Sequence, residues 1–396
     1  MQTTANNKRI QSVDFLRGFV MLIMALDHVR DFFHETAMTA DPTDMNTTTP
    51  VLFFTRWITH FCAPTFVFLS GLSAYLAGFK KTKVRQSGFL IKRGLWLILV
   101  EMVVITFGLT FNPFYNSIIF QVIWAIGFSM VILGLLIRTS MKVIIAVGAA
   151  LVLCHNIFDF FPVANDNAGA VLLNSLISGG PNFIPFTSNR GLLVFYTALP
   201  WTGLMLLGYA MGFYFTASFS QQQRKKILLK YGLLVVAFFV IVRFINVYGD
   251  PAHWSTQKNA VFTLLSFLNT TKYPPSLLYS CMTIGPSLIV LALTENIQGR
   301  FSKIVSVYGK VPFFYYLFHF YLIHTLCLIF FFASGYTLSQ KVDPQQTLFW
   351  FRPANFGYSL PIVYLIWFCV IAVLYFPCRW FARYKQTHTQ WWLSYL

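Results

Sequence analysis

Apolar stretches alternate with short polar connections along most of this chain. Ten of these stretches have the roughly 20 residues that a helix needs to cross the ~30 Å hydrocarbon core of a bilayer. They are predicted at 12–34, 51–79, 94–111, 118–137, 142–161, 193–216, 229–248, 273–294, 311–334 and 358–378. The pattern predicts an all-α fold: a polytopic integral membrane protein with about ten transmembrane helices.

The same pattern sets the expected domain organisation. Residues 1–11 form an N-terminal segment, 12–378 one transmembrane domain and 379–396 a C-terminal tail. Charged residues interrupt the first apolar run, so we expect a retained helix there and not a cleaved signal peptide. Residues 258–270 are predicted to form a short interfacial helix. The connection 162–192, rich in Asn, Gly and Ser, is either a substrate loop or a solvated linker.

Composition and charge fit a membrane protein. Hydrophobic residues make up 57% of the chain and charged residues only 10%, against about 25% charged residues in soluble domains. Of the 29 Lys and Arg, twenty fall on the side of the N-terminus and seven on the other side. This bias predicts that both termini are cytoplasmic. It also explains the net charge of +17 without nucleic acid as a partner. The six cysteines lack metal-ligand spacing, so neither a metal site nor a disulfide is expected.

The first apolar stretch carries charges that a simple membrane anchor would avoid. A charge at bilayer depth costs about 2.5–3.5 kcal/mol even on lenient scales. Two charged residues lie near the start of the stretch and five polar or charged residues crowd its end: Asp14 and Arg17, then Asp27, His28, Arg30, Asp31 and His34. Such a segment predicts a role in chemistry or transport.

Arg17 and His28 are eleven residues apart, so a helix would project both from one face, about 16 Å apart along its axis. His28 is the candidate base, because an imidazole exchanges a proton near neutral pH. Asp31 is close enough in sequence to orient that ring, and His34 could use the same carboxylate instead. Asp14 is spaced to pair with Arg17, which leaves simple anchoring of the helix as the alternative.

Other apolar stretches carry further candidates. His60 falls near the depth of His28 with Arg56 one turn above it, which fits either substrate contact or structural pairing. Lys272 precedes a Pro-Pro entry suited to lining a cavity.

Two more polar positions lie deep in apolar stretches. Of His319 and His324, which are five residues apart, at most one is expected to reach a site with His28, and His319 lies nearer the midplane. Glu101 is expected to pair with a His or an Arg.

Four segments in order then carry a resemblance: VDFLRGFVMLIMALDH, THFCAPTFVFLSG, TKYPPSLLYSCMTIGPSL and YGKVPFFYYLFHFYLIH. Together they resemble the heparan-α-glucosaminide N-acetyltransferase-like family in its bacterial branch, over about residues 10–378. The spacing of Arg17 and His28 is also similar to the first-helix motif of the broader transmembrane acyltransferases.

The resemblance implies an acyltransferase of the bacterial inner membrane. Cytosolic acetyl-CoA, or a longer acyl-CoA, would be the donor, and an amine or hydroxyl of an extracytoplasmic saccharide or lipid-linked sugar the acceptor. No metal is implied. Arg17, Lys92 and Arg93 would hold the CoA phosphates. The resemblance does not fix the oligomeric state: the protein is either a monomer or a homodimer in the lipid membrane.

The catalytic assignment stays open between two histidines. The broader acyltransferase motif favours His28, acting with Asp27 and Asp31. Lysosomal members carry their active His in the loop after the first helix and an Asn where His28 stands, which favours His34. The remaining candidates for contact with substrate or CoA are Asp14, Arg30, Arg56, His60, Lys272 and His319. The competing hypotheses are a proton-coupled transporter or exporter that uses the same Asp, His and Arg cluster, and a noncatalytic membrane scaffold.

Overall fold

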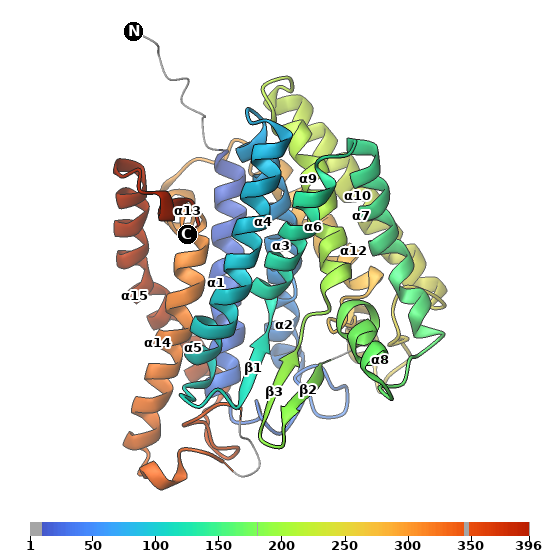
Figure 1. Ribbon diagram of the computed structural model, residues 1–396. Helices are drawn as coiled ribbons and strands as arrows, with labels where there is room; N and C mark the ends of the chain where they lie inside the picture. Colours follow the sequence, from blue (N-terminus) through green and yellow to red (C-terminus); the bar gives the residue numbers. More distant parts are fainter. Residues whose placement is uncertain (1–9, 180, 344–347, 396) are drawn as a thin grey trace.

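The computed structural model describes residues 10–179, 181–343 and 348–395, and helices dominate it (Figure 1). The main helices are α1 (Gln11–Phe33), α2 (Pro50–Thr59), α3 (Cys62–Gly78), α4 (Lys83–Val100), α6 (Val122–Leu136), α7 (Met141–Cys154), α9 (Ala198–Met211), α10 (Gln221–Ile245), α12 (Leu277–Leu293), α13 (Arg300–Lys310), α14 (Pro312–Ala333) and α15 (Leu360–Thr387). Shorter helical segments are η1 (Glu101–Ile105), α5 (Thr106–Thr110), η2 (His155–Asp159), α8 (Ala168–Leu173), η3 (Asn174–Ser178), η4 (Gly212–Phe215), α11 (Ala260–Leu268), η5 (Leu338–Gln340) and η6 (Trp391–Ser394).

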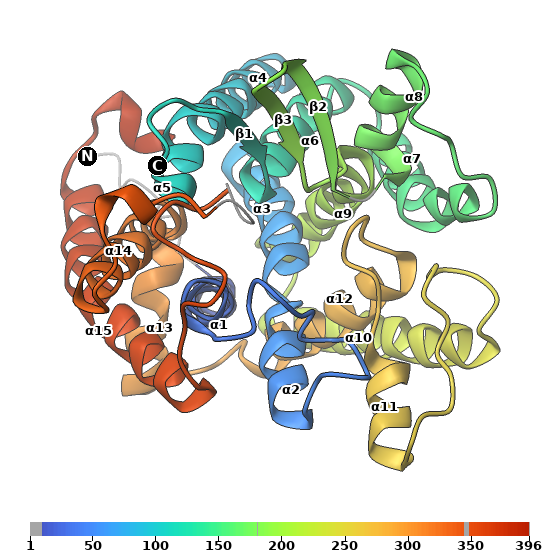
Figure 2. The same cartoon turned by 90° about the horizontal axis from the view of Figure 1, so that it is seen from below.

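Helix α1 lies inside the bundle and is not a lipid-facing helix. Seventeen of its 23 residues are buried, and α2, α3, α12, α13, α14 and α15 all pack against it (Figure 2). It approaches α13 so closely that a Cβ at Gly18 or Gly309 would collide with the backbone of the other helix. The surrounding helices therefore shield the charged residues of α1 from lipid.

Within the residues that the structure describes, five helical segments are long and apolar enough to cross a membrane. They are Pro50–Gly78, Met141–Asp159, Gln221–Ile245, Pro312–Ala333 and Leu360–Thr387. Three of them bury less than a third of their most apolar window, so most of that surface is available to lipid. Helix α1 is not one of these five segments, because it carries too many charged residues. The chain is thus a mostly helical membrane protein, and the count of ten spans stays a prediction.

A small sheet corrects the all-α expectation. Strand β3 (Arg190–Val194) lies between β1 (Ser117–Phe120), to which it is parallel, and β2 (Asn182–Thr187), to which it is antiparallel. Ser117 pairs with Gly191, and Phe183 with Leu193. The sheet lies at the end of the bundle opposite the start of α1 (Figure 1). The sequence did not predict these strands, because a short apolar run such as Ser117–Phe120 has no periodicity that separates strand from helix.

Several boundaries also differ from prediction. Helix α4 starts at Lys83, well before residue 94, and α15 continues past residue 378 to Thr387. Beyond α15 the chain returns to the bundle, where the ring of Tyr395 lies 5.6 Å from Trp96. The connection 162–192 contains α8, η3 and β2. The expected interfacial helix at 258–270 is present as α11.

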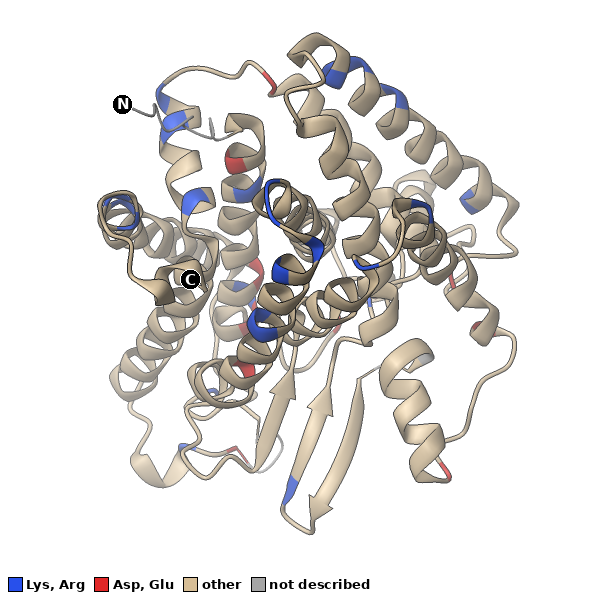
Figure 3. Cartoon of the chain, turned by 45° about the horizontal axis from the view of Figure 1, so that its top comes forward, with Lys and Arg blue, Asp and Glu red and all other residues tan. Residues whose placement is uncertain are grey.

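Basic residues gather toward the end of the bundle where α1 begins (Figure 3). The start of α1 and the C-terminal segment both lie toward this end (Figure 1). Positive-inside bias predicts that this end faces the cytoplasm. Lys8 and Arg9, which contribute to that prediction, lie outside the described residues.

Candidate active site

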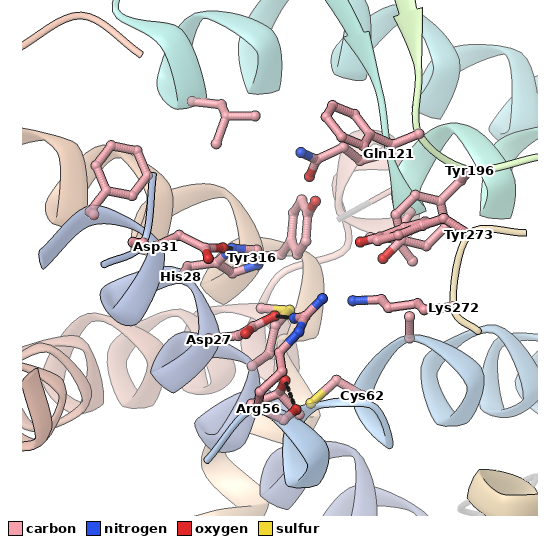
Figure 4. Close-up of a pocket in the computed structure, with 18 of the residues that line it drawn as sticks. Asp27, His28, Asp31, Arg56, Cys62, Gln121, Tyr196, Lys272, Tyr273 and Tyr316 are labelled. Carbon is pink, nitrogen blue, oxygen red and sulfur yellow. Dashed lines mark hydrogen bonds and ion pairs between the residues drawn. The ribbon is translucent and has the colours of Figure 1, made fainter. Parts of the chain in front are cut away.

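A cavity of about 300 Å³ opens beside the last two turns of α1, and we call it the His28 cavity. Its walls come from α1, α2, α3, the ends of β1 and β3, the segment before α12, and α14. The polar and thiol side chains that line it are Asp27, His28, Asp31, Arg56, Thr59, Cys62, Gln121, Tyr196, Lys272, Tyr273 and Tyr316. Figure 4 shows most of them converging on one space. The structure therefore gathers side chains from distant parts of the sequence around one imidazole.

His28 is the only histidine among the lining residues of this cavity in the described chain. Its ring centroid lies 4.5 Å from that of Phe320 and 5.2 Å from that of His319. Its Nδ1 is 3.9 Å from Oδ2 of Asp31, too far for a direct hydrogen bond. The side chain of His28 keeps 19% of its surface exposed. An accessible imidazole in a mostly buried helix has the features of a general base.

The expected acidic partners of His28 are held by arginines. Asp27 pairs with Arg56 of α2 and, at 3.1 Å, with Nη2 of Arg30. The same Nη2 donates to Oδ1 of Asp31 at 2.6 Å. Buried charges of this kind persist when they are paired and hydrogen-bonded. The cluster therefore ties α2 to the end of α1 and fixes the wall of the cavity, with Asp31 still facing His28.

His34 and His60 are absent from the lining of this cavity. His34 ends α1, and its Nδ1 lies 3.0 Å from Oγ1 of Thr36, while its carbonyl accepts a hydrogen bond from Arg352 at 2.8 Å. His60 stands at the break between α2 and α3, where its carbonyl accepts a hydrogen bond from Tyr279 at 2.9 Å. Neither imidazole lines the His28 cavity.

The two histidines of α14 have separate surroundings. His324 stacks on Phe111 at 3.8 Å and binds the carbonyl of Trp350 at 2.7 Å. His319 binds the carbonyl of Tyr316 through Nδ1. Since a carbonyl only accepts, that nitrogen carries the hydrogen, and Nε2 of the neutral ring is left as an acceptor. This Nε2 is buried without a partner in the described chain, on the ring beside His28. His319 is therefore a second candidate to orient His28.

Lys272 reaches the His28 cavity from a segment that an aspartate holds in place. Oδ2 of Asp250 accepts hydrogen bonds from the Thr271 amide at 2.9 Å and the Ser276 hydroxyl at 2.6 Å. These bonds bracket Lys272 and Tyr273, which line the cavity from opposite His28 (Figure 4). Asp250 is therefore a positioning residue, and the expected lining role of Lys272 fits the geometry.

A second cavity, of about 220 Å³, lies nearer the start of α1, and we call it the basic cavity. Five cations line it: Arg17, Lys81, Arg93, Lys310 and Lys385. Among the described residues no Asp or Glu lines it. Arg17 donates to Oγ of Ser73 at 2.6 Å and to the carbonyl of Gly309 at 3.2 Å, and its Nη1 lies 3.7 Å from Asp14. The charge of this cavity suits a phosphate-bearing ligand.

A small connecting cavity of about 80 Å³ lies between these two. It shares Ser70 and Arg93 with the basic cavity, and Val122 and Tyr316 with the His28 cavity. Phe66 lines all three. The three cavities therefore adjoin one another along α1.

Arg17 and His28 lie at opposite ends of this series, as their shared helix face predicts. Of the two neighbouring cations expected to hold phosphates, Arg93 lines the basic cavity, whereas Lys92 is exposed on another side of α4.

Sequence reasoning missed the aromatic and amide part of the site. Tyr196, Tyr273, Tyr316 and Gln121 all line the His28 cavity. Tyr273 and Tyr316 lie within the quoted segments TKYPPSLLYSCMTIGPSL and YGKVPFFYYLFHFYLIH, the one signal that could have found them. Glu101 was expected to pair with a His or an Arg. It instead accepts hydrogen bonds from the amides of Gln121 and Trp124 at the start of α6.

No group of three His, Cys, Asp or Glu with metal-site geometry occurs among the residues that the structure describes. The chemistry of the cavity walls is that of an imidazole, several phenols and paired charges.

Comparison with known proteins identifies the family of the chain. The family described as heparan-alpha-glucosaminide N-acetyltransferase, catalytic, matches residues 9–244, more than half of the chain. The matched part contains α1 with Arg17 and His28, and the helices that carry Arg56 and Arg93. A search of curated proteins finds no match. The chain belongs to the heparan-alpha-glucosaminide N-acetyltransferase catalytic-domain family.

Proposed function

We propose that this membrane acetyltransferase takes its acetyl group from acetyl-CoA bound in the basic cavity. The acceptor would be an amine or hydroxyl of a sugar that reaches the His28 cavity from the opposite end of the bundle. Membership of the family supports acetyl transfer in general.

The donor is inferred from charge and shape. CoA carries several phosphate charges, and the five cations of the basic cavity suit them. Nε of Arg93 is buried without a hydrogen-bond partner in the described chain, so this guanidinium still has a donor to offer. The connecting cavity is mostly apolar, lined by Met21, Leu97, Ile123, Ile126 and Phe313 among others, and suits the slender pantetheine arm.

One observation carries the proposal: three adjoining cavities run along α1 from a basic mouth to an imidazole. This arrangement favours a reaction in which a thioester enters from one end and meets a nucleophile from the other. If the basic end faces the cytoplasm, as the distribution of Lys and Arg predicts, the acetyl group would cross the membrane of a bacterial cell while the CoA nucleotide stayed inside.

His28 would act as the general base. The acceptor nitrogen or oxygen attacks the thioester carbonyl carbon while a ring nitrogen of His28 takes the acceptor proton. The tetrahedral intermediate then collapses, the C–S bond breaks, and His28 returns the proton to the sulfur to release CoA as a thiol. Transfer through an acetylated His28 is the other form of the mechanism.

The far wall of the His28 cavity suits a saccharide. Tyr196 and Tyr273 present aromatic rings 5.4 Å apart between centroids, and rings of this kind pack against apolar faces while their hydroxyls bond polar groups. Lys272 and Gln121 add polar contacts on the same side of the cavity (Figure 4). A free sugar, a polysaccharide end and a lipid-linked sugar all present the groups that these side chains would bind.

A matched pair of histidine variants tests the function. Proteoliposomes containing the wild type, His28→Gln or His34→Gln would be given acetyl-CoA with D-glucosamine or hydroxylamine, and release of CoA thiol would be followed. His28→Gln should lower kcat by about 10²- to 10⁴-fold, because a positioned base contributes that much. His34→Gln should stay within about twofold of wild type, because its ring does not line the cavity.

Two outcomes would contradict the proposal. Absence of thiol release by the wild type with every acceptor would refute acetyl transfer from acetyl-CoA. Loss of activity in His34→Gln with full activity in His28→Gln would move the catalytic role to His34.

A further inference from the structure

Tyr316 occupies the place where the connecting cavity meets the His28 cavity. It lines both, and it comes from the first turns of α14. Its ring and that of His28 surround the same two neighbours. Tyr316 lies 5.4 Å from His319 and 5.3 Å from Phe320 between ring centroids, and His28 lies 5.2 Å and 4.5 Å from them. The phenol and the imidazole therefore contact the same two rings, and both line the His28 cavity.

The hydroxyl of Tyr316 is buried and has no hydrogen-bond partner in the described chain. The residue as a whole is 4% exposed. Buried tyrosine hydroxyls normally find a partner, because an unpaired polar group away from water is unfavourable. Figure 4 shows the phenol within the lined space on the side of Gln121, with no dashed line to a neighbour. The Tyr316 hydroxyl therefore has no hydrogen-bond partner among the described residues, and its side chain lines both cavities.

The rest of the Tyr316 residue is firmly held. Its carbonyl accepts from Nδ1 of His319, and its ring packs against Phe320. A rigid side chain with an unused donor is pre-organised, so little reorganisation is needed when a negative charge forms next to it.

We propose that Tyr316 is a catalytic residue that donates a hydrogen bond to the thioester oxygen during acetyl transfer. This inference rests on the proposed function, since it assumes that an acetyl thioester reaches the junction between the two cavities. The position fits that assumption: a group arriving through the connecting cavity passes Tyr316 as it reaches His28.

The step is balanced without a further reactant. As the acceptor attacks the carbonyl carbon, the C=O electron pair moves onto oxygen, and the Tyr316 O–H binds the resulting oxyanion while keeping its own proton. His28 holds the acceptor proton. When the C–S bond breaks, the carbonyl re-forms, the hydrogen bond to Tyr316 weakens, and His28 passes the proton to the sulfur.

The neighbouring residue provides a matched control. Tyr315 is also on α14, is also buried, and also has a hydroxyl without a partner in the described chain. Its ring stacks on that of His319 at 5.6 Å. Unlike Tyr316, however, it lines none of the three cavities. Tyr315→Phe therefore removes a phenol oxygen from the same helix without altering the lining of any of the three cavities.

The experiment compares the wild type, Tyr316→Phe and Tyr315→Phe in proteoliposomes with acetyl-CoA and either D-glucosamine or hydroxylamine. CoA-thiol release gives kcat and KM, and CoA binding and thermal unfolding are measured on each protein. Tyr316→Phe should lower kcat by about 10²- to 10³-fold, the loss typical of one oxyanion donor. KM for acetyl-CoA and CoA affinity should change by less than about threefold, because the ground-state thioester gains little from the donor. Tyr315→Phe should match the wild type in all four quantities.

Three other results would overturn either the role of Tyr316 or the proposed function. If the wild type turns over and Tyr316→Phe keeps kcat within about threefold of it, Tyr316 is not a donor and the proposed function still stands. If Tyr316→Phe no longer binds CoA or unfolds at a lower temperature than Tyr315→Phe, the hydroxyl is structural and the inference fails. If the wild type releases no thiol, the proposed function fails first.

Discussion

His28 differs from three buried histidines of this chain in what surrounds its ring. His155, His319 and His324 bind backbone carbonyls through a ring nitrogen. His28 instead lines a cavity, and its Nδ1 lies 3.9 Å from Oδ2 of Asp31. The sequence alone could not tell which histidine lines a cavity and which bind carbonyls, because this depends on which helix lies opposite each ring.

Spacing within one helix was predictable, whereas partners from other helices were not. The eleven residues between Arg17 and His28 correctly indicate a common face that follows the series of cavities. The predicted partner of Glu101, a His or an Arg, was wrong. Backbone amides at the start of a helix can satisfy a buried carboxylate as well as a cation does. Tyr316 shows the same limit: its role depends on where two cavities meet.

Asp31 supplies a prediction at this scale. One of its oxygens accepts from Arg30 at 2.6 Å, and the other lies 3.9 Å from His28. With no direct hydrogen bond to the imidazole, Asp31→Asn should lower kcat by only about tenfold or less, compared with the larger loss for His28→Gln. The measurement is CoA-thiol release in the same proteoliposomes.

A loss in Asp31→Asn as large as that in His28→Gln would contradict this expectation. It would mean that the 3.9 Å gap closes in the substrate complex, so that Asp31 orients the ring directly. His319→Gln, which alters the other candidate orienter of His28, would then be expected to have the smaller effect.

At the scale of elements, the long apolar helices were predictable and the short elements were not. The five segments able to cross a membrane fall on predicted stretches, because twenty apolar residues in a row have few other folded forms. The strands β1, β2 and β3 have four to six residues each, and β1 pairs with β3 across about 70 residues of sequence. Local patterns carry no information about such pairing.

Helix α3 gives the prediction for this scale. Ser70 lines both the basic and the connecting cavity. An indole there would fill the connecting cavity, whose volume is only about 80 Å³. Ser70→Trp should lower kcat/KM for acetyl-CoA by about 10²-fold, because small displacements of a reacting group have effects of that size.

Ser70→Ala is the matched control and should remain near wild type, since it keeps the passage open. Thiol release and thermal unfolding would be measured for both variants. A Ser70→Trp protein that is stable and fully active would show that the donor does not use the connecting cavity.

At the scale of the whole molecule, the arrangement is one charged helix shielded by apolar ones. Three of the segments long enough to cross a membrane bury less than a third of their most apolar window, whereas α1 is largely buried and borders all three cavities. A helix with this many charges is stable at bilayer depth only when protein or water surrounds it. The class of protein followed from composition, but the series of cavities required the packing of α1 against α3 and α14.

The candidate site includes residues beyond the part of the chain that the family matches. The match ends at residue 244, yet Lys272 and Tyr316 come from later segments. The site is complete only when α14 and the segment before α12 pack against the matched part. The matched part therefore contains the proposed base, His28, and the cations Arg17, Lys81 and Arg93 of the basic cavity, whereas the proposed oxyanion donor, Tyr316, lies outside it.

The most direct test of the account is a cryo-electron microscopy map of the protein with S-acetonyl-CoA, a ketone that replaces the thioester. We predict that the CoA phosphates lie among Arg17, Lys81 and Arg93, that the pantetheine arm passes Phe66, and that the carbonyl oxygen lies within hydrogen-bond distance of Tyr316 and next to His28. CoA bound at the opposite end of the bundle, or at the basic cavity with its arm directed away from the connecting cavity, would contradict the proposal that the thioester reaches His28 from the basic cavity.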